Sequence, residues 1–171
     1  MDLYSYIRDV PDFPKPGIMF KDITPLLENA EALREALDLM VEDARSIEVD
    51  KVAGIESRGF LFGVPIAAAL GVGFIPVRKA GKLPFHTNQV EYALEYGTAT
   101  VEMHIDALEP GERILLVDDL MATGGTMVAA SRLVEAAGGV VASCNVLVDL
   151  AFLNGRKALG EKRFHTVLTY A

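Results

Sequence analysis

The chain carries the run Ile114-Leu-Leu-Val-Asp-Asp-Leu-Met-Ala-Thr-Gly-Gly-Thr126, around which the rest of the sequence can be organised. Its leading apolar residues predict a buried strand over 113–117, and two adjacent carboxylates follow that strand. After a small Thr-Gly-Gly-Thr loop, apolar residues at helical spacing predict a helix over 124–137, which a Gly-Gly pair ends. A second strand is predicted over 140–150. Strand, helix and strand in this order form the unit from which parallel sheets are built.

The sequence before this run also alternates between helices and strands. An amphipathic helix is predicted over 29–46, since its apolar residues recur at the spacing of one helical face. The other predicted elements are a strand over 51–55, a helix over 59–70, a strand over 74–78, and a hairpin of 90–94 with 98–105. We therefore expect an α/β fold with a mainly parallel twisted sheet flanked by helices, in a single domain of residues 1–171. Ligands bind such sheets at the carboxyl ends of the strands.

The composition argues against several classes of protein. There are 16 Lys and Arg against 24 Asp and Glu, a formal net charge of −8, which disfavours nucleic-acid or anionic-membrane binding driven by overall charge. The single cysteine, Cys144, reads as a core residue, and a chain that can form no internal disulfide suits a reducing cytoplasm. The uncharged segment 59–77 is nearly long enough to span a bilayer, but Pro65 and a Gly-Val-Gly turn at 71–73 divide it. We therefore expect a cytoplasmic protein with no nucleic-acid or membrane partner.

The run at 114–126 combines two kinds of chemistry. Backbone N–H groups at the start of the helix, with the hydroxyls of Thr123 and Thr126 beside them, suit a phosphate monoester. The carboxylates of Asp118 and Asp119 repel phosphate but accept hydrogen bonds from vicinal hydroxyls, directly or through a hydrated Mg²⁺. A phosphate on one side and a diol on the other describe a sugar phosphate. The alternative is an ordinary strand, acidic turn and helix capped by one of the threonines, as in many α/β proteins.

The same run resembles the signature with which type I phosphoribosyltransferases bind 5-phosphoribosyl-1-pyrophosphate (PRPP). The rest of the chain is similar to the adenine phosphoribosyltransferases of that family, over nearly all 171 residues. The further motifs that carry the resemblance are Phe13-Pro-Lys-Pro-Gly-Ile-Met-Phe-Lys-Asp-Ile23, Gly54-Ile-Glu-Ser-Arg-Gly-Phe60, Arg78-Lys-Ala-Gly-Lys-Leu-Pro84 and Leu94-Glu-Tyr-Gly97. The resemblance implies the type I phosphoribosyltransferase fold and a pentosyltransferase, which is a kind of glycosyltransferase.

The resemblance also implies which residues bind PRPP. These are Ser57, Arg58, Gly59, Arg78, Lys79, Lys82, Asp118, Asp119, Ala122, Thr123, Gly124, Gly125 and Thr126. Considered without the family, Arg58 could simply extend to solvent from a helix start, and the basic cluster at 78–82 could be a solvated charge run. Mg²⁺ is the expected cofactor, held mainly by PRPP, pyrophosphate and water, near Asp118 and Asp119.

Adenine, according to the resemblance, binds to an N-terminal hood of residues about 1–27. Phe20 would stack on the purine, while backbone groups of Met19 and Lys21 would bind its polar edge. A fixed carbonyl accepts a hydrogen bond from the exocyclic amine of adenine but repels the carbonyl of a 6-oxopurine. Glu95 would face N7 and help N9 lose its proton. From the residues alone, Phe20 could equally be a core residue and Glu95 a solvated residue at a hairpin tip.

The activity implied by the resemblance is transfer of the 5-phosphoribosyl group from PRPP to adenine, giving AMP and pyrophosphate in purine salvage, by a homodimer. The candidate catalytic residues are Glu95, Asp118 and Asp119. Two alternatives stay open: a 6-oxopurine phosphoribosyltransferase, and a PRPP-binding regulatory protein without turnover. A regulator of that kind typically needs an added nucleic-acid-binding element, and the sequence predicts none.

Overall fold

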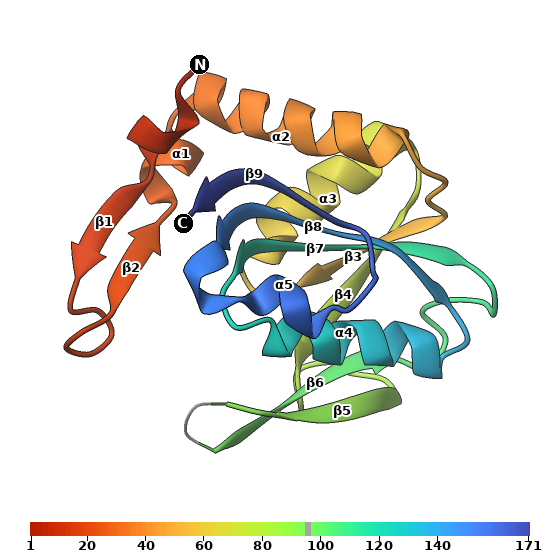
Figure 1. Cartoon of the computed structure of the whole chain (residues 1–171). Helices are drawn as coiled ribbons and strands as arrows, with labels where there is room; N and C mark the ends of the chain where they lie inside the picture. Colours follow the sequence, from red (N-terminus) through yellow and green to blue (C-terminus); the bar gives the residue numbers. More distant parts are fainter. Residues whose placement is uncertain (95–96) are drawn as a thin grey trace. The chain divides into compact units, whose positions relative to one another are not determined.

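The chain divides into two compact units, Met1–Leu39 and Met40–Ala171 (Figure 1). The computed structural model describes residues 1–94 and 97–171. Among these residues the second unit holds a seven-stranded sheet of order β5-β6-β4-β3-β7-β8-β9. The strands are β3 (Lys51–Ile55), β4 (Gly73–Lys79), β5 (Thr87–Ala93), β6 (Thr98–His104), β7 (Arg113–Met121), β8 (Val140–Leu150) and β9 (Phe164–Tyr170).

Most of this sheet is parallel. Strands β4, β3, β7, β8 and β9 pair in parallel with their neighbours, whereas β5 and β6 form an antiparallel hairpin at one edge. The hairpin joins β4 through a short antiparallel pairing that sets Arg78 opposite Glu102. The carboxyl ends of β3, β4 and β7 therefore lie at one edge of the sheet, the usual place for a ligand. The predicted α/β class is confirmed.

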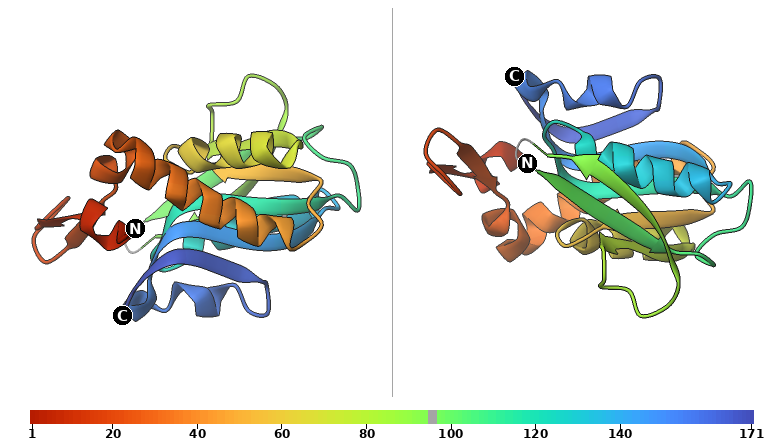
Figure 2. Two further views of the ribbon diagram at one scale, coloured as in Figure 1. Left: turned by 90° about the horizontal axis from the view of Figure 1, so that it is seen from above. Right: turned by 90° about the horizontal axis from the view of Figure 1, so that it is seen from below.

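Helices cover both faces of the sheet (Figure 2). Helix α3 (Gly59–Leu70) packs on β3 and β7, and α4 (Gly125–Ala136) lies on the opposite face, against β5 and β6. A short 3-10 helix, η2 (Ala151–Leu153), and helix α5 (Gly155–Ala158) connect β8 to β9. Strands β7 and β8 are buried at most positions because both faces are covered, which explains their continuous apolar runs.

The first unit contains a small antiparallel sheet. Its elements are η1 (Leu3–Tyr6), β1 (Arg8–Pro11), β2 (Met19–Asp22) and α1 (Thr24–Glu28), and the next helix, α2 (Ala30–Arg45), continues into the second unit. Strands β1 and β2 pair with each other. The ring of Phe20 meets that of Phe13 edge-on, with centroids 5.1 Å apart, and the Lys21 ammonium forms an ion pair with Asp9. That residues about 1–27 form a hood over a base stays a prediction.

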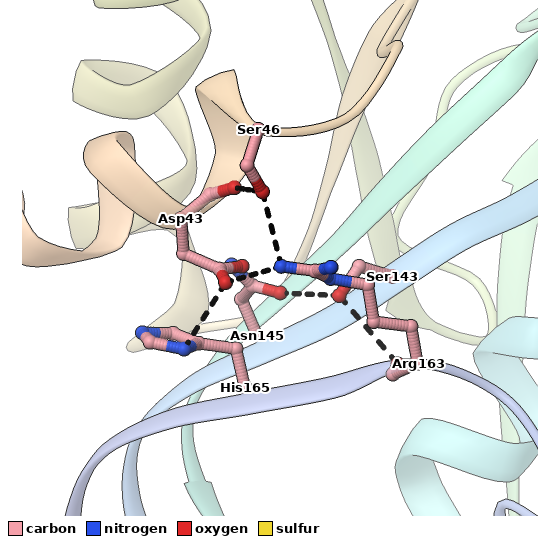
Figure 3. A network of polar contacts seen from close by, with 6 residues as sticks. All are labelled: Asp43, Ser46, Ser143, Asn145, Arg163 and His165. Atoms are coloured by element: carbon pink, nitrogen blue, oxygen red, sulfur yellow. Dashed lines mark hydrogen bonds and ion pairs between the residues drawn. The ribbon is translucent and has the colours of Figure 1, made fainter.

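A polar network ties the C-terminal end of α2 to β8 and β9 (Figure 3). Asp43 accepts hydrogen bonds from the guanidinium of Arg163 and from Nδ2 of Asn145, the latter at 3.0 Å. Nδ1 of His165 lies 3.3 Å from the same carboxylate, and Ser143 donates to Oδ1 of Asn145 at 2.7 Å. Asp43 and Asn145 are 102 residues apart, so the network holds together elements that are distant in the sequence.

The structure differs from the sequence prediction in the extent of one strand and in elements that were not predicted. The strand predicted over 113–117 continues to Met121, so Asp118 and Asp119 lie within β7, because β8 keeps pairing with it as far as Met121. Helix α5 and the elements η1, β1, β2 and α1 of the first unit have no counterpart among the predicted elements. Cys144 is fully buried, as predicted. Within the described residues, the helices are all too short or too polar to span a bilayer.

Candidate active site

A cavity of about 310 Å³ lies at the carboxyl ends of β3, β4 and β7. Its walls come from these strand ends, the beginnings of α3 and α4, and the β5–β6 hairpin. The lining residues are Ile55, Glu56, Ser57, Arg58, Val77, Lys79, Tyr92, Val101, Asp118, Asp119, Leu120 and Thr126. The 54–60 motif, the basic cluster and the 114–126 run therefore contribute to one cavity, at the edge of the sheet where the sequence predicted a ligand.

The Thr-Gly-Gly-Thr loop turns sharply into α4. Gly124 has a φ of +88°, and α4 begins at Gly125, so the first N–H groups of the helix have no acceptor within it. A side chain at position 124 is also excluded by packing, because an ideal Cβ would lie 2.6 Å from the carbonyl oxygen of Gly155. Thr126 Oγ1 donates a hydrogen bond to the hydroxyl of Tyr92 at 3.2 Å. The loop has the backbone geometry of an anion site at a helix N-terminus.

Asp118 and Asp119 form an acidic pair of adjacent residues. Asp119 is only 4% exposed, and its backbone N–H donates to Oδ1 of Asp118 at 2.9 Å. Burial raises the pKa of Asp118 well above its ordinary value, and the neighbouring charge of Asp119 raises it further. Burial also raises the pKa of Asp119, although Arg58 opposes this with its Nε 2.9 Å from Oδ2. Hydroxyl donors or a cation would therefore stabilise the charged pair.

Glu56 organises the basic residues of the cavity. Its carboxylate accepts hydrogen bonds from Nη2 of Arg78 at 3.1 Å and from the backbone N–H of Lys79. Burial favours a higher pKa for Glu56, but the Lys79 N–H and the charges of Arg78 and Lys82 outweigh it, so the pKa is lowered. Because its pKa is lowered, Glu56 stays charged at neutral pH and balances part of the positive charge of Arg78, Lys79 and Lys82. A cis peptide bond joins Glu56 to Ser57.

The remaining predicted PRPP residues belong to the same three segments without lining the cavity. They are Gly59, Arg78, Lys82, Ala122, Thr123, Gly124 and Gly125. Gly59 brings α3 directly against β7, since an ideal Cβ would lie 2.8 Å from the carbonyl oxygen of Val117 and 3.0 Å from Oδ1 of Asp118. Lys82 is exposed on the loop after β4.

The residues predicted to bind adenine belong to other parts of the chain. Met19, Phe20 and Lys21 lie on β2 in the first unit, where Met19 is exposed, Phe20 is half-buried and Lys21 is buried. Glu95 lies outside the described residues. The roles of these four residues stay predictions.

Six residues that line the cavity were not among the predicted site residues, and two of them, Glu56 and Tyr92, carry polar groups. Glu56 could have been found, since it directly precedes Ser57 in a motif that already pointed to an anion. Tyr92 carried no signal beyond strand alternation, because its contact with Thr126 spans 34 positions.

The acidic pair also determines how a metal could bind. Within the described residues, 1–94 and 97–171, no group of three or more His, Cys, Asp or Glu side chains could hold a metal ion. Asp118 and Asp119 supply carboxylate oxygens, which Mg²⁺ prefers. Two carboxylates fit an ion whose other ligands are phosphate oxygens and water.

Comparison with known proteins identifies the family. Residues 22–167 match the phosphoribosyl transferase domain family. The adenine phosphoribosyltransferase of Thermobifida fusca is 54% identical over 164 residues, which cover 96% of this chain and 93% of that relative. The chain belongs to the adenine phosphoribosyltransferase family. This membership confirms the resemblance read from the sequence motifs.

Solved structures of adenine phosphoribosyltransferases share the fold throughout. The enzyme from Thermoanaerobacter pseudethanolicus matches with a TM-score of 0.96 at 48% identity, over 99% of this chain and 98% of that one. The enzyme from Saccharomyces cerevisiae, complexed with an imino-altritol bisphosphate and adenine, matches with a TM-score of 0.90 at 40% identity, over 98% and 97% of the two chains. The predicted type I fold and pentosyltransferase class are confirmed.

Proposed function

We propose that this chain transfers the 5-phosphoribosyl group of PRPP to N9 of adenine, giving AMP and pyrophosphate in purine salvage. The observation that carries this proposal is the cavity at the carboxyl edge of the sheet, where a helix N-terminus, an acidic pair and basic residues come together. Membership of the adenine phosphoribosyltransferase family supports it independently. The Saccharomyces cerevisiae relative has been solved with adenine bound.

The ribose 5-phosphate part of PRPP binds the 114–126 run in this proposal. The 5′-phosphate accepts hydrogen bonds from the backbone N–H groups of the loop from Thr123 to Thr126, where the helix dipole favours negative charge. The ribose hydroxyls donate to Asp118 and Asp119. Such donors offset the cost that burial imposes on the charged pair, which is the physical meaning of its raised pKa values.

The pyrophosphate part of PRPP binds the basic side of the cavity. Ser57, Arg58 and Gly59 lie at the start of α3, and Arg78, Lys79 and Lys82 supply further positive charge. Bond breaking at C1 leaves positive charge on the ribose and negative charge on the departing pyrophosphate. Fixed cations stabilise that anion, and Mg²⁺ bound to the phosphates supplies further charge neutralisation. Catalysis by the chain itself therefore consists mainly of charge stabilisation and positioning.

Adenine, in the same proposal, is held by the hood. Phe20 stacks on the base, and backbone groups of Met19 and Lys21 bind its polar edge. Glu95 faces N7, and its carboxylate takes up the proton that the base loses as N9 bonds to C1. Backbone recognition explains a preference for adenine, since the exocyclic amine of adenine donates to a fixed carbonyl, whereas the oxygen at position 6 of a 6-oxopurine cannot.

A substrate competition assay tests the reaction. The purified chain is incubated with PRPP, Mg²⁺ and either adenine, hypoxanthine or guanine, and pyrophosphate release is followed. We expect release with adenine, at a kcat/KM at least about a hundredfold above that with either 6-oxopurine. A preference for hypoxanthine or guanine would establish the 6-oxopurine alternative. Tight PRPP binding without release with any base would establish a regulator.

The assembly and location of the chain complete the proposal. We expect a homodimer, as the family resemblance implies, and a cytoplasmic location, with which the free, buried Cys144 agrees. Sedimentation equilibrium measures the oligomeric state, and a monomer at micromolar concentration would contradict the dimer.

A further inference from the structure

Glu102 on β6 is a fully buried carboxylate that receives four hydrogen bonds. The residue is 1% exposed. Its Oε1 accepts from the backbone N–H groups of Lys82 and Leu83 at 2.9 and 2.8 Å. Its Oε2 accepts from Oγ1 of Thr87 and from Nε2 of Gln89, both at 3.1 Å. One side chain therefore links β6, the loop after β4, and the start of β5.

The bonds to Glu102 keep its carboxylate charged. Burial favours a raised pKa, but the backbone N–H groups of Leu83, Gly81 and Lys82 and the hydroxyl of Thr87 outweigh it, so the pKa is lowered. Consecutive N–H groups that converge on one point form a concave anion site. Here the anion that binds these N–H groups is the carboxylate of Glu102 on β6. A buried charge is tolerated only where it is paired in this way.

The loop that Glu102 organises carries Lys82 into the basic cluster. Nη1 of Arg78 donates to the carbonyl oxygen of Lys82 at 3.3 Å, and the charge of Lys82 acts on the cavity residue Glu56. The backbone N–H of Ala80 donates to the carbonyl oxygen of Thr100 at 3.0 Å, which fixes the start of the loop on β6. Without an anion at position 102, the N–H groups of Lys82 and Leu83 would have to find other acceptors, and the loop would shift.

We propose that Glu102 is a positioning residue for the reaction, which sets the affinity for PRPP by holding the backbone of Lys82 and Leu83. The inference rests on the proposed role of the basic cluster in binding pyrophosphate. It adds to that role a residue from a strand outside the recognised motifs. Its effect acts through Lys82, so Glu102 itself does not touch substrate.

The test compares Glu102→Gln with a matched control. Gln keeps the shape of the side chain but removes the charge, so its hydrogen bonds to the loop N–H groups are weaker. Glu112 is the control, because it also accepts from a backbone N–H, that of Glu109 at 2.8 Å, and pairs with Lys51 at 2.9 Å. We expect Glu102→Gln to raise the KM for PRPP about five- to tenfold, with kcat and the KM for adenine within about twofold of wild type. Glu112→Gln leaves all three constants unchanged.

A double mutant separates positioning from general loss of structure. Lys82→Ala alone should also raise the KM for PRPP. If Glu102 acts through Lys82, the double variant should bind PRPP about as weakly as Lys82→Ala alone, so the two effects do not multiply. A purely structural role predicts instead that the two effects multiply, or that kcat and both KM values change together.

The possible failures can be told apart. If Lys82→Ala leaves the KM for PRPP unchanged, the role of Lys82 in binding pyrophosphate is wrong, and the proposal for Glu102, which acts through Lys82, is overturned with it. If Lys82→Ala raises it and Glu102→Gln does not, only the role of Glu102 is overturned. Should Glu102→Gln fail to fold, Thr87→Val removes one donor to Oε2 while keeping the carboxylate and the loop N–H groups. It is expected to raise the KM for PRPP about three- to fivefold, and a value within about twofold of wild type would overturn the proposal.

Discussion

Nε of Arg58 lies 2.9 Å from Oδ2 of Asp119, and this ion pair joins two motifs that are 61 positions apart in the chain. Both residues line the same cavity. The carboxylate is buried whereas the guanidinium is partly exposed, so Arg58 keeps positive charge at the cavity wall while it pairs with Asp119. Positive and negative groups are thus held together before substrate binds, which reduces the rearrangement that catalysis requires.

Asp118→Asn is expected to lower activity while raising stability. The folded-state pKa of Asp118 is raised, so its charged form opposes folding at neutral pH, and a neutral Asn removes that cost. We expect kcat/KM to fall by more than about tenfold, which is roughly 1.4 kcal/mol of transition-state stabilisation. Thermal unfolding at pH 7 should show a Tm higher by about 2–4 °C for each kcal/mol gained.

The pH dependence of this stability difference provides the control. The advantage of Asp118→Asn exists at pH values above the folded pKa of the native aspartate. This stability difference shrinks as the pH falls from the folded pKa toward the ordinary value of about 3.9, and it vanishes below that value, where Asp118 is protonated in both states. A variant less stable than wild type at pH 7, or one with wild-type kcat/KM, would contradict the role given to Asp118.

Gly124→Ala is expected to damage both the fold and the phosphate loop. Gly124 has a φ of +88°, and a Cβ added at this position would lie 2.6 Å from the carbonyl oxygen of Gly155. Gly111 is a matched control, with a φ of +87° and open space around its Cβ. Gly111→Ala should lower the free energy of unfolding by about 1–2 kcal/mol from backbone strain alone. Gly124→Ala should lower it by about 1–3 kcal/mol more, because the start of α4 must move to make room for the Cβ.

Kinetics separate these two glycine variants further. The KM for PRPP should rise in Gly124→Ala, since the loop N–H groups move with the backbone, and should stay at the wild-type value in Gly111→Ala. Equal losses of unfolding free energy in denaturant melts, with equal KM values, would show that the contact with Gly155 has no consequence.

The local parts of this site could be predicted from the sequence, and the long-range parts could not. The order of strand, carboxylates, glycine loop and helix from Ile114 to Thr126 depends on neighbouring residues, so its elements were recognisable. Tyr92 and Glu102 act through contacts that span 34 and about 20 positions, and no local pattern marks them. The continuation of β7 to Met121 depends on pairing with β8, which the sequence of β7 alone does not contain.

Asp43→Ala is expected to destabilise the protein without changing its kinetics. The substitution removes the acceptor for Arg163 and Asn145, and it leaves the amide of the fully buried Asn145 without its partner. We expect the free energy of unfolding to fall by about 1–3 kcal/mol. The control is Glu48→Ala, because the Glu48 side chain is 92% exposed and lies 3.9 Å from Arg113. Loss of so weak an ion pair should not change the Tm measurably. Equal Tm values for both variants would mean that the Asp43 network does not stabilise the fold.

Cys144 is expected to be inert in the native protein. Burial raises the pKa of its thiol to about 11, so almost none of it is thiolate at pH 8. Titration with a chromogenic disulfide reagent should label no thiol in the native state and one per chain in guanidinium chloride. Rapid labelling of the native protein would show that β8 opens readily to solvent.

A crystal structure of the chain with AMP and pyrophosphate tests the central claim most directly. The account places the 5′-phosphate on the backbone N–H groups between Thr123 and Thr126, with the ribose hydroxyls within hydrogen-bond distance of Asp118 and Asp119. It places pyrophosphate beside Arg58 and Lys79. A nucleotide bound with its phosphate elsewhere, or with its ribose turned away from the acidic pair, would contradict the account.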